Sequence, residues 1–185
     1  EYSTFVTHLE CSFTGKTYPA DQLHGLSEAG KPLLVRYDLD ALGKAIKKPD
    51  LVERAPEFWR YREFLPIRKS ENVVRLGELM TPILPAKKLQ SELSCGEILI
   101  KDEGRLPTGS FKARGLAIAV AMAKELGVTS MAMPTNGNAG AALAAYCSRA
   151  GIETFVICPE DTPRVNIEEN AFQGAKTFLA NGFIN

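Results

Sequence analysis

The spacing of hydrophobic residues becomes regular after residue 96 and predicts alternating strands and helices there. Short apolar runs predict strands, and apolar residues that recur every three or four positions predict amphipathic helices. The predicted strands cover 97–101, 129–133, 153–158 and 175–179, and the predicted helices cover about 110–126, 138–150 and 164–173. Strands that alternate with helices of this length are typical of βαβ units around a parallel sheet. The second half is therefore predicted to be α/β.

The first half of the chain is less regular. Glycines and prolines break every apolar stretch of residues 1–36, which predicts a small β-rich or irregular lobe. Residues 37–95 are predicted to form a helical and extended segment, and residues 96–185 a βαβ domain. The sequence thus predicts three successive units.

Two short helices are predicted in the middle segment. The first begins after Asp38, a predicted N-cap, and Pro49 is expected to end it. The second covers about 56–65. The prolines within 80–85 exclude regular helix there, because proline lacks the backbone donor and restricts the residue before it.

Charge and composition narrow the function classes. The 185 residues include 22 basic and 22 acidic side chains, and this zero net charge argues against broad binding to nucleic acid. No apolar run approaches the roughly 18 residues of a membrane helix, and no signal-peptide pattern opens the chain. The four cysteines lack the spacing of a disulfide scaffold. We expect a cytoplasmic protein, or a plastid protein after loss of a transit peptide, with neither nucleic acid nor membrane as a partner.

The loop and helix start around Lys112 contain residues suited to covalent chemistry. Loops that follow the strands of βαβ units meet at one edge of the sheet, where ligands bind. Lys112 falls in the first helical turn, with Thr108 or Ser110 as the predicted N-cap. The positive end of the helix and the apolar neighbours Phe111 and Leu116 would both favour a neutral amine, which Schiff-base chemistry requires. A solvated lysine on an amphipathic helix is the alternative.

The next loop along the chain offers polar groups at a helix N-terminus. Gly137 allows a ligand to approach the backbone, and Thr135 and Asn138 supply a hydroxyl and an amide that suit an anion or a phenolate oxygen. An ordinary Asn-Gly turn with Asn138 as the N-cap is the alternative. The separation of 26 residues from Lys112, one crossover, favours a common site.

These loops resemble a known enzyme family. The segments Pro107-Thr108-Gly109-Ser110-Phe111-Lys112-Ala113-Arg114-Gly115 and Thr135-Asn136-Gly137-Asn138-Ala139-Gly140 are similar to those of fold type II enzymes that use pyridoxal 5′-phosphate, and among these most similar to the threonine synthase family. Supporting stretches are 32–39, 59–66, 76–78 and 81–82. The resemblance implies a truncated, three-layer parallel-sheet domain of the tryptophan synthase β-like type, with a small N-terminal lobe.

The resemblance also implies roles for individual residues. Lys112 matches the lysine that holds the cofactor as a Schiff base and later shuttles protons. Asn138 matches the asparagine that donates a hydrogen bond to the cofactor's ring oxygen. Thr135, Asn136 and Gly137 match the loop that receives the substrate's carboxylate or phosphate. The implied reaction converts O-phosphohomoserine and water to threonine and phosphate.

Two departures from the family pattern matter. Many threonine synthases carry a zinc-knuckle-like N-terminus with two cysteine pairs, whereas Cys11 is accompanied here by Thr14, Ser27 and Ala29 at the expected positions. We therefore expect a degenerate knuckle and no metal site. The family's glycine-rich phosphate loop has no counterpart, since the sequence has no consecutive glycines. The chain thus resembles the N-terminal portion of such an enzyme.

Three functions stay open on this reasoning. The first is threonine synthase, which segments 35–38 and 59–62 favour, and the second is another fold type II enzyme, such as a serine or threonine ammonia-lyase or a cysteine synthase-like enzyme. The third is a non-catalytic module that forms a homo-oligomer through an uncovered sheet. Arg62 and Arg114 are interpreted as partners in structural ion pairs rather than as phosphate ligands.

Overall fold

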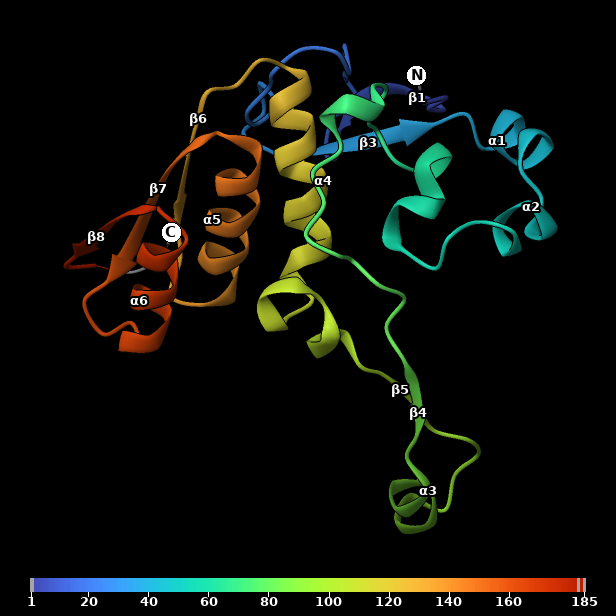
Figure 1. The fold of residues 1–185 in the computed structure, drawn as a ribbon. Coiled ribbons are helices and arrows are strands. Elements are labelled where there is room, and N and C mark those ends of the chain that lie inside the picture. The colour runs from blue at the N-terminus through green and yellow to red at the C-terminus, as the bar shows by residue number, and fades with distance from the viewer. Residues whose placement is uncertain (1, 183, 185) are drawn as a thin grey trace.

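The computed structural model describes residues 2–182 and 184, and this part of the chain contains three sheets. An antiparallel sheet in the N-terminal lobe has the order β2-β1-β3, and a parallel sheet has the order β6-β7-β8. Between them in sequence lies a two-stranded antiparallel ribbon, β4-β5, which projects from the rest of the molecule (Figure 1). The strands are β1 (Val6–Cys11), β2 (Thr17–Tyr18), β3 (Leu33–Tyr37), β4 (Ile83–Pro85), β5 (Leu99–Lys101), β6 (Ser130–Pro134), β7 (Glu153–Pro159) and β8 (Lys176–Ala180).

The parallel sheet confirms the predicted α/β fold class. Helix α5 (Asn138–Ala150) contacts β6 and β7, and α6 (Arg164–Phe172) contacts β8. The two helices also contact each other, so they cover the same face of the sheet. A second helical layer on the opposite face is not among the described residues. The elements from β6 to β8 lie within one or two residues of the predicted ranges, because strands and helices alternate there in a clear hydrophobic pattern.

The core lies where α4 (Lys112–Glu125) packs against α5. Alanines make up much of this interface, and their small side chains allow the two backbones to approach closely. Larger side chains from α5 fill the remaining space: Leu143, Tyr146 and Cys147 are all fully buried. This helix pair therefore forms the rigid support for both loops singled out in the sequence.

A buried carboxylate joins the middle segment to α5. Glu78 is 2% exposed, and it accepts hydrogen bonds from Tyr146 Oη (2.6 Å), Trp59 Nε1 (3.1 Å) and Leu76 N (2.8 Å). Burial and the neighbouring carboxylate raise the pKa of the Tyr146 phenol above its usual range, so this group stays a donor. The three donors satisfy a charge that would otherwise be costly to bury.

In the N-terminal lobe, Cys11 lies next to Thr14 and Ser27, two of the residues at the positions that the family resemblance compares with a zinc knuckle. Cys11 is buried, with its Sγ 3.1 Å from Ser27 Oγ and 3.4 Å from the Thr14 backbone N–H. Lys31 N donates to Ser27 Oγ at 3.1 Å and so closes the turn formed by residues 27–31. Hydrogen bonds thus connect Cys11 with Thr14 and Ser27, two of the positions at which the family resemblance would place further metal ligands. In the described residues, no group of three or more His, Cys, Asp or Glu side chains could hold a metal ion.

The middle segment corrects two sequence predictions. Helix α1 (Leu39–Ala45) is capped by Asp38 as predicted, with 2.8 Å from Asp38 Oδ1 to Ala41 N, but it ends before Pro49. Pro49 instead lies in the first turn of α2 (Lys48–Val52), where a missing N–H costs nothing. The helix predicted at 56–65 is a 3₁₀-helix, η1 (Phe58–Phe64), with a break at Tyr61.

The prediction that strand 97–101 belongs to the parallel sheet is wrong. β5 pairs antiparallel with β4, and the two strands flank the short helix α3 (Lys87–Leu93). After α3 the chain reverses at Ser94, which has a left-handed backbone (φ 48°), so β5 runs back along β4. We call residues 83–101 the arm.

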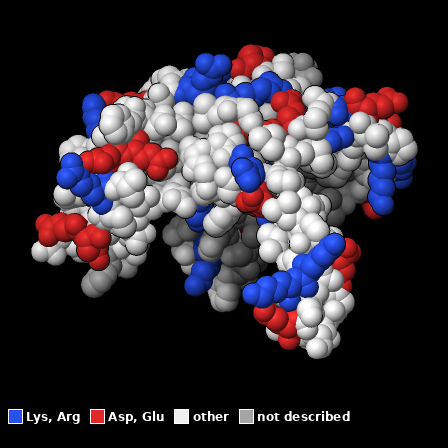
Figure 2. Space-filling model, turned by 60° about the horizontal axis from the view of Figure 1, so that its bottom comes forward, with Lys and Arg blue, Asp and Glu red and all other residues white. Residues whose placement is uncertain are grey.

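The molecular surface mixes charges of both signs. The face shown in Figure 2 carries basic and acidic side chains next to one another, both on the projecting arm and on the rest of the molecule, which we call the body. Within the described part of the chain, no helix combines the length and apolarity needed to cross a membrane.

Candidate active site

The structure brings the two loops together even though β5 lies outside the parallel sheet. The short 3₁₀-helix η4 (Pro107–Gly109), just before α4, contacts α5. Figure 1 shows the N-termini of α4 and α5 at the same end of the helix pair, the end at which β6 and β7 also finish. The first residue of each helix is a predicted site residue: Lys112 in α4 and Asn138 in α5. Helix packing therefore achieves the convergence that sheet topology was expected to provide.

Lys112 is half-buried and has few polar contacts. In the described residues no carboxylate forms an ion pair with its ammonium group, which lies 4.8 Å from the centroid of the Phe111 ring. Phe111 is 60% exposed, so it removes little water from the lysine, and its ring face attracts a cation. Phe111 therefore does not desolvate Lys112 as expected. Its ring instead forms a cation–π contact with the ammonium group. The amine is left without a competing anionic partner.

The turn before Lys112 has a constrained backbone. Thr108 is one of two described non-glycine residues with positive φ (63°), a conformation that costs about 1 kcal/mol or more. Its Oγ1 is buried and has no hydrogen-bond partner. Thr108 is therefore not an N-cap: Phe111 occupies that position without a side-chain cap bond, and Ser110 Oγ accepts from Lys112 N at 3.4 Å.

An ion pair fixes this loop to α4. Arg114 binds Glu103 through two guanidinium nitrogens, one of them 2.8 Å from Oε1, and Thr81 Oγ1 donates to the same oxygen at 2.6 Å. The Arg114 guanidinium, followed by Thr81, lowers the pKa of the Glu103 carboxyl to about 2. The interpretation of Arg114 as a structural partner is confirmed. Arg62 likewise lies 3.3 Å from Glu63.

The second loop is shaped by Thr135. Its hydroxyl is buried, accepts from Gly137 N at 3.2 Å and lies 3.3 Å from Gly137 O, so it stabilises the loop rather than facing solvent. Gly137 is the N-cap of α5 and provides no side-chain cap, and Asn138 is the first helical residue with an exposed side chain. The alternative in which Asn138 caps the helix is therefore wrong. The amide of Asn138 is free for a ligand.

Close packing around the second loop explains why residue 140 is a glycine. A Cβ at this position would lie 2.5 Å from Thr135 Cγ2 and 3.1 Å from both Asn170 Oδ1 and Val156 Cγ1. These atoms belong to the loop, to α6 and to β7. Only glycine lets α5 begin this close to the end of the sheet.

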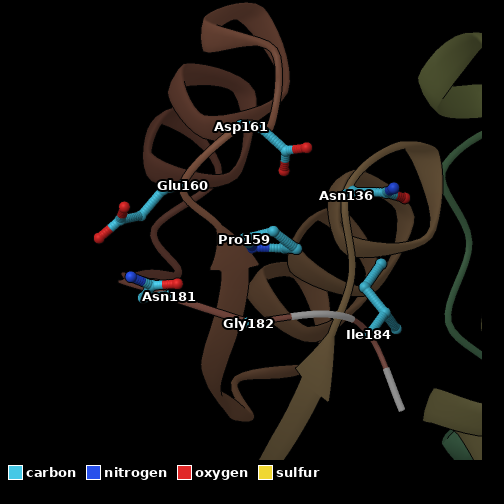
Figure 3. A pocket seen from close by; sticks show the side chains of 7 residues that line it. All are labelled: Asn136, Pro159, Glu160, Asp161, Asn181, Gly182 and Ile184. Atoms are coloured by element: carbon cyan, nitrogen blue, oxygen red, sulfur yellow. The ribbon is translucent and has the colours of Figure 1, made fainter.

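A pocket of about 510 Å³ lies at the carboxyl edge of the parallel sheet (Figure 3). Asn136 contributes from the loop after β6, and Figure 3 shows its side chain on the opposite side of the pocket from Glu160. The lining residues are Asn136, Pro159, Glu160, Asp161, Asn181, Gly182 and Ile184. Of the predicted site residues, only Asn136 lines it, so Lys112 and Asn138 lie outside this pocket.

Sequence reasoning missed the remaining lining residues, although a signal was present. Pro159 ends β7 and Asn181 follows β8, so both lie at the edge where Asn136 follows β6. The rule that ligands bind at the carboxyl ends of parallel strands applies to all three loops. The loops after β7 and β8 contain no recognisable motif, so only their position after a parallel strand indicates them.

Comparison with known proteins identifies the family. Residues 74–184 match the family model described as pyridoxal-phosphate dependent enzyme. The chain belongs to this family. Its members depend on pyridoxal phosphate, which agrees with the cofactor predicted from the loops.

Relatives of this pyridoxal-phosphate-dependent family are found by sequence and by structure. The threonine synthase of Methanocaldococcus jannaschii is 36% identical over 173 residues, which cover 93% of this chain and 43% of the relative. That of Halalkalibacterium halodurans is 44% identical over 100 residues, 54% of this chain and 28% of the relative. In fold, the chain is similar to diaminopropionate ammonia lyase from Escherichia coli, with a TM-score of 0.56, 19% identity and coverage of 62% of this chain and 35% of the other. The chain therefore spans less than half the length of these relatives.

The observed geometry fits pyridoxal phosphate. A primary amine without an anionic partner suits covalent attachment to the cofactor's carbonyl carbon. The buried, unpartnered hydroxyl of Thr108 lies in the turn just before that amine and has unused hydrogen-bonding capacity. The first N–H groups of α5 have no side-chain cap and favour negative charge.

Proposed function

We propose that residues 96–185 form the lysine-bearing domain of a threonine synthase, which converts O-phosphohomoserine and water to threonine and phosphate. The observation that carries the proposal is the contact of η4 with α5, which brings the turn before Lys112 next to the helix that begins at Asn138. The threonine synthases that match 54–93% of the chain support this choice of reaction.

In this proposal Lys112 is the catalytic residue. Its Nζ would hold the cofactor through the carbonyl group, and the same nitrogen would hold and move a proton of the substrate. When bound, pyridoxal phosphate supplies the electron sink for carbanion chemistry.

The second loop orients the cofactor and the substrate in this proposal. The exposed amide of Asn138 would hold the cofactor by donating a hydrogen bond to its ring oxygen. Backbone N–H groups at the start of α5 and the side chain of Asn136 receive the substrate's carboxylate or phosphate. Thr135 acts through its bonds to Gly137, which keep the loop in shape.

Covalent trapping tests the role of Lys112. The chain is incubated with pyridoxal 5′-phosphate, reduced with borohydride and digested for peptide mapping. We expect the modification on Lys112, and its loss in Lys112→Ala. Lys124→Ala is the matched control, because this lysine lies in the last turn of the same helix and binds Glu71 O. Modification of other lysines to the same extent, or none at Lys112, would contradict the proposal.

The substrate is tested on the cofactor-loaded chain by its visible spectrum. O-Phosphohomoserine is expected to change the absorption of the bound cofactor at concentrations at which serine does not. Asn136→Ala should weaken this response, because it removes an amide from the substrate loop. A spectrum that responds to serine alone would exclude threonine synthase and favour an ammonia-lyase type of reaction.

A further inference from the structure

Two asparagines of the pocket in Figure 3 are each followed by a glycine. Asn136-Gly137 comes after β6 and Asn181-Gly182 comes after β8, and these are the two Asn-Gly pairs of the sequence. Glycine has no Cβ, so its backbone nitrogen can closely approach the carboxamide carbon of the preceding asparagine. Each asparagine is therefore suited to a reaction with its own backbone.

This reaction is an intramolecular substitution that releases ammonia. The glycine nitrogen gives up its proton and attacks Cγ of the asparagine. A bond from this nitrogen to Cγ forms, the bond from Cγ to the amide nitrogen breaks, and the amide nitrogen leaves with the proton as ammonia. Water then opens the five-membered imide at either carbonyl carbon and leaves aspartate or isoaspartate. Water is the only co-reactant, so no partner molecule is required.

The two asparagines have similar surroundings. Asn136 and Asn181 are both exposed, and both line the same pocket. A Cβ added at Gly137 or at Gly182 would have no atom within 4 Å, so the space beside both glycines is open. The difference between the two pairs lies instead in the backbone nitrogen of the glycine.

The nitrogen of Gly137 is held by a hydrogen bond. It donates to Thr135 Oγ1 at 3.2 Å, and Thr135 is only 5% exposed. Thr135 is itself fixed to β7, because its backbone N–H donates to Ile157 O at 2.9 Å. On the helix side, Gly140 N donates to Gly137 O at 3.1 Å. Attack by the Gly137 nitrogen would break its bond to Thr135, which makes the reaction at Asn136 less favourable.

The nitrogen of Gly182 is not held in this way. The ladder between β7 and β8 ends at the pair Pro159 and Ala180, and Glu160 N then donates to Ala180 O at 3.2 Å. Within the described part of the chain, the N–H of Gly182 donates to no backbone or side-chain acceptor. This nitrogen can therefore react without first losing a hydrogen bond to the protein.

We propose that Asn181 is a site of spontaneous deamidation through Gly182, and that the Thr135 hydroxyl protects Asn136 from the same reaction. The product at position 181 adds a carboxylate to a pocket that already contains Glu160 and Asp161. The net charge of the chain falls by one unit from zero, and the pocket becomes less favourable for an anion. The inference does not depend on the proposed function.

Peptide mapping of the aged chain tests the difference between the two sites. The folded chain is incubated at mildly alkaline pH, and deamidation of each peptide is followed by mass spectrometry. We expect Asn181 to react about 3- to 10-fold faster than Asn136, the factor that one hydrogen bond contributes, and the two rates to converge in guanidinium chloride. Gly182→Ala is the control: the added Cβ fits the fold and should slow the reaction at Asn181 alone. Equal rates in the folded chain, or a faster reaction at Asn136, would overturn the proposal.

A pair of substitutions isolates the hydroxyl of Thr135. Thr135→Val removes the hydroxyl and keeps the shape of the side chain, so it should raise the rate at Asn136 about 3- to 10-fold and leave Asn181 unchanged. Thr135→Ser keeps the hydroxyl and should stay near the wild-type rate. A Thr135→Val chain with native circular dichroism and the wild-type rate at Asn136 would show that the hydroxyl does not protect. The comparison of Asn136 with Asn181 in the wild-type chain decides the matter if Thr135→Val does not fold.

Discussion

Helices α5 and α3 differ in what stabilises them. Eight of the 13 residues of α5 are buried, including Tyr146 and Cys147, whereas α3 contains no buried residue. α5 contacts α4, α6 and the sheet, while α3 connects the two strands of an exposed ribbon. Helical stability in proteins comes mainly from packing, so the two regions should respond differently to substitution. Substitutions in α5 should therefore lower the free energy of unfolding more than substitutions in α3 of the arm.

The largest loss of stability is expected for substitution of Glu78, which connects Trp59 of the middle segment to Tyr146 of α5. Glu78→Ala removes the acceptor of three hydrogen bonds and leaves the buried donors of Trp59 and Tyr146 unsatisfied. We expect a loss of about 3–5 kcal/mol in the free energy of unfolding, measured by urea denaturation. Glu78→Gln keeps the volume and one acceptor, so it should lose clearly less. Equal stability of Glu78→Ala and the wild type would mean that this network does not stabilise the body.

A pair of glycine substitutions separates close packing from helix propensity. Gly140→Ala places a methyl group against Thr135, Asn170 and Val156, and should lower the unfolding free energy by about 1–3 kcal/mol. Gly115→Ala in α4 is the control: no atom lies within 4 Å of its added Cβ, so it should stabilise by about 0.5–1 kcal/mol. Thermal unfolding of both variants gives the comparison. Changes of the same sign would refute the packing argument.

The sequence predicted the body better than the arm for a physical reason. From β6 to β8, hydrophobic periodicity reports burial against neighbours in the parallel sheet, so the predicted element types are correct and their limits agree within one or two residues. In the arm, the run before Lys101 is apolar because both faces of β5 are, and periodicity does not reveal which strand pairs with it. The reversal at Ser94 left no clear signal, since serine rarely adopts positive φ.

The candidate site could be predicted from the sequence only in part. Motifs single out Lys112 and Asn138 as candidates, and the packing of α4 against α5 brings their helices together. The inward-facing hydroxyl of Thr135 and the pairing of Arg114 with Glu103 depend on side-chain orientation. The pocket residues Glu160 and Asn181 come from loops without a motif, and only their place after parallel strands indicates them.

An intermediate loss of stability is expected for substitution of Glu103, which follows the arm and pairs with Arg114 of α4. Glu103 has a pKa of about 2 in the folded chain, lowered from 4.5 mainly by Arg114, so its ionised form stabilises the fold. This contribution is complete above the unfolded pKa of 4.5 and is lost as the pH falls towards 2. Glu103→Gln should cost about 1–2 kcal/mol at pH 7 and flatten the dependence of stability on pH below 4.5. Parallel pH profiles for both proteins would show that the ion pair contributes nothing.

The smallest effect is expected at Leu93 in α3. This residue is 60% exposed and belongs to no buried cluster, so Leu93→Ser should change the unfolding free energy by no more than about 0.5 kcal/mol. Leu143→Ala in α5 is the matched control, because this leucine is fully buried and its truncation should cost about 2–5 kcal/mol. Similar losses for the two leucines would mean that the arm is covered in solution.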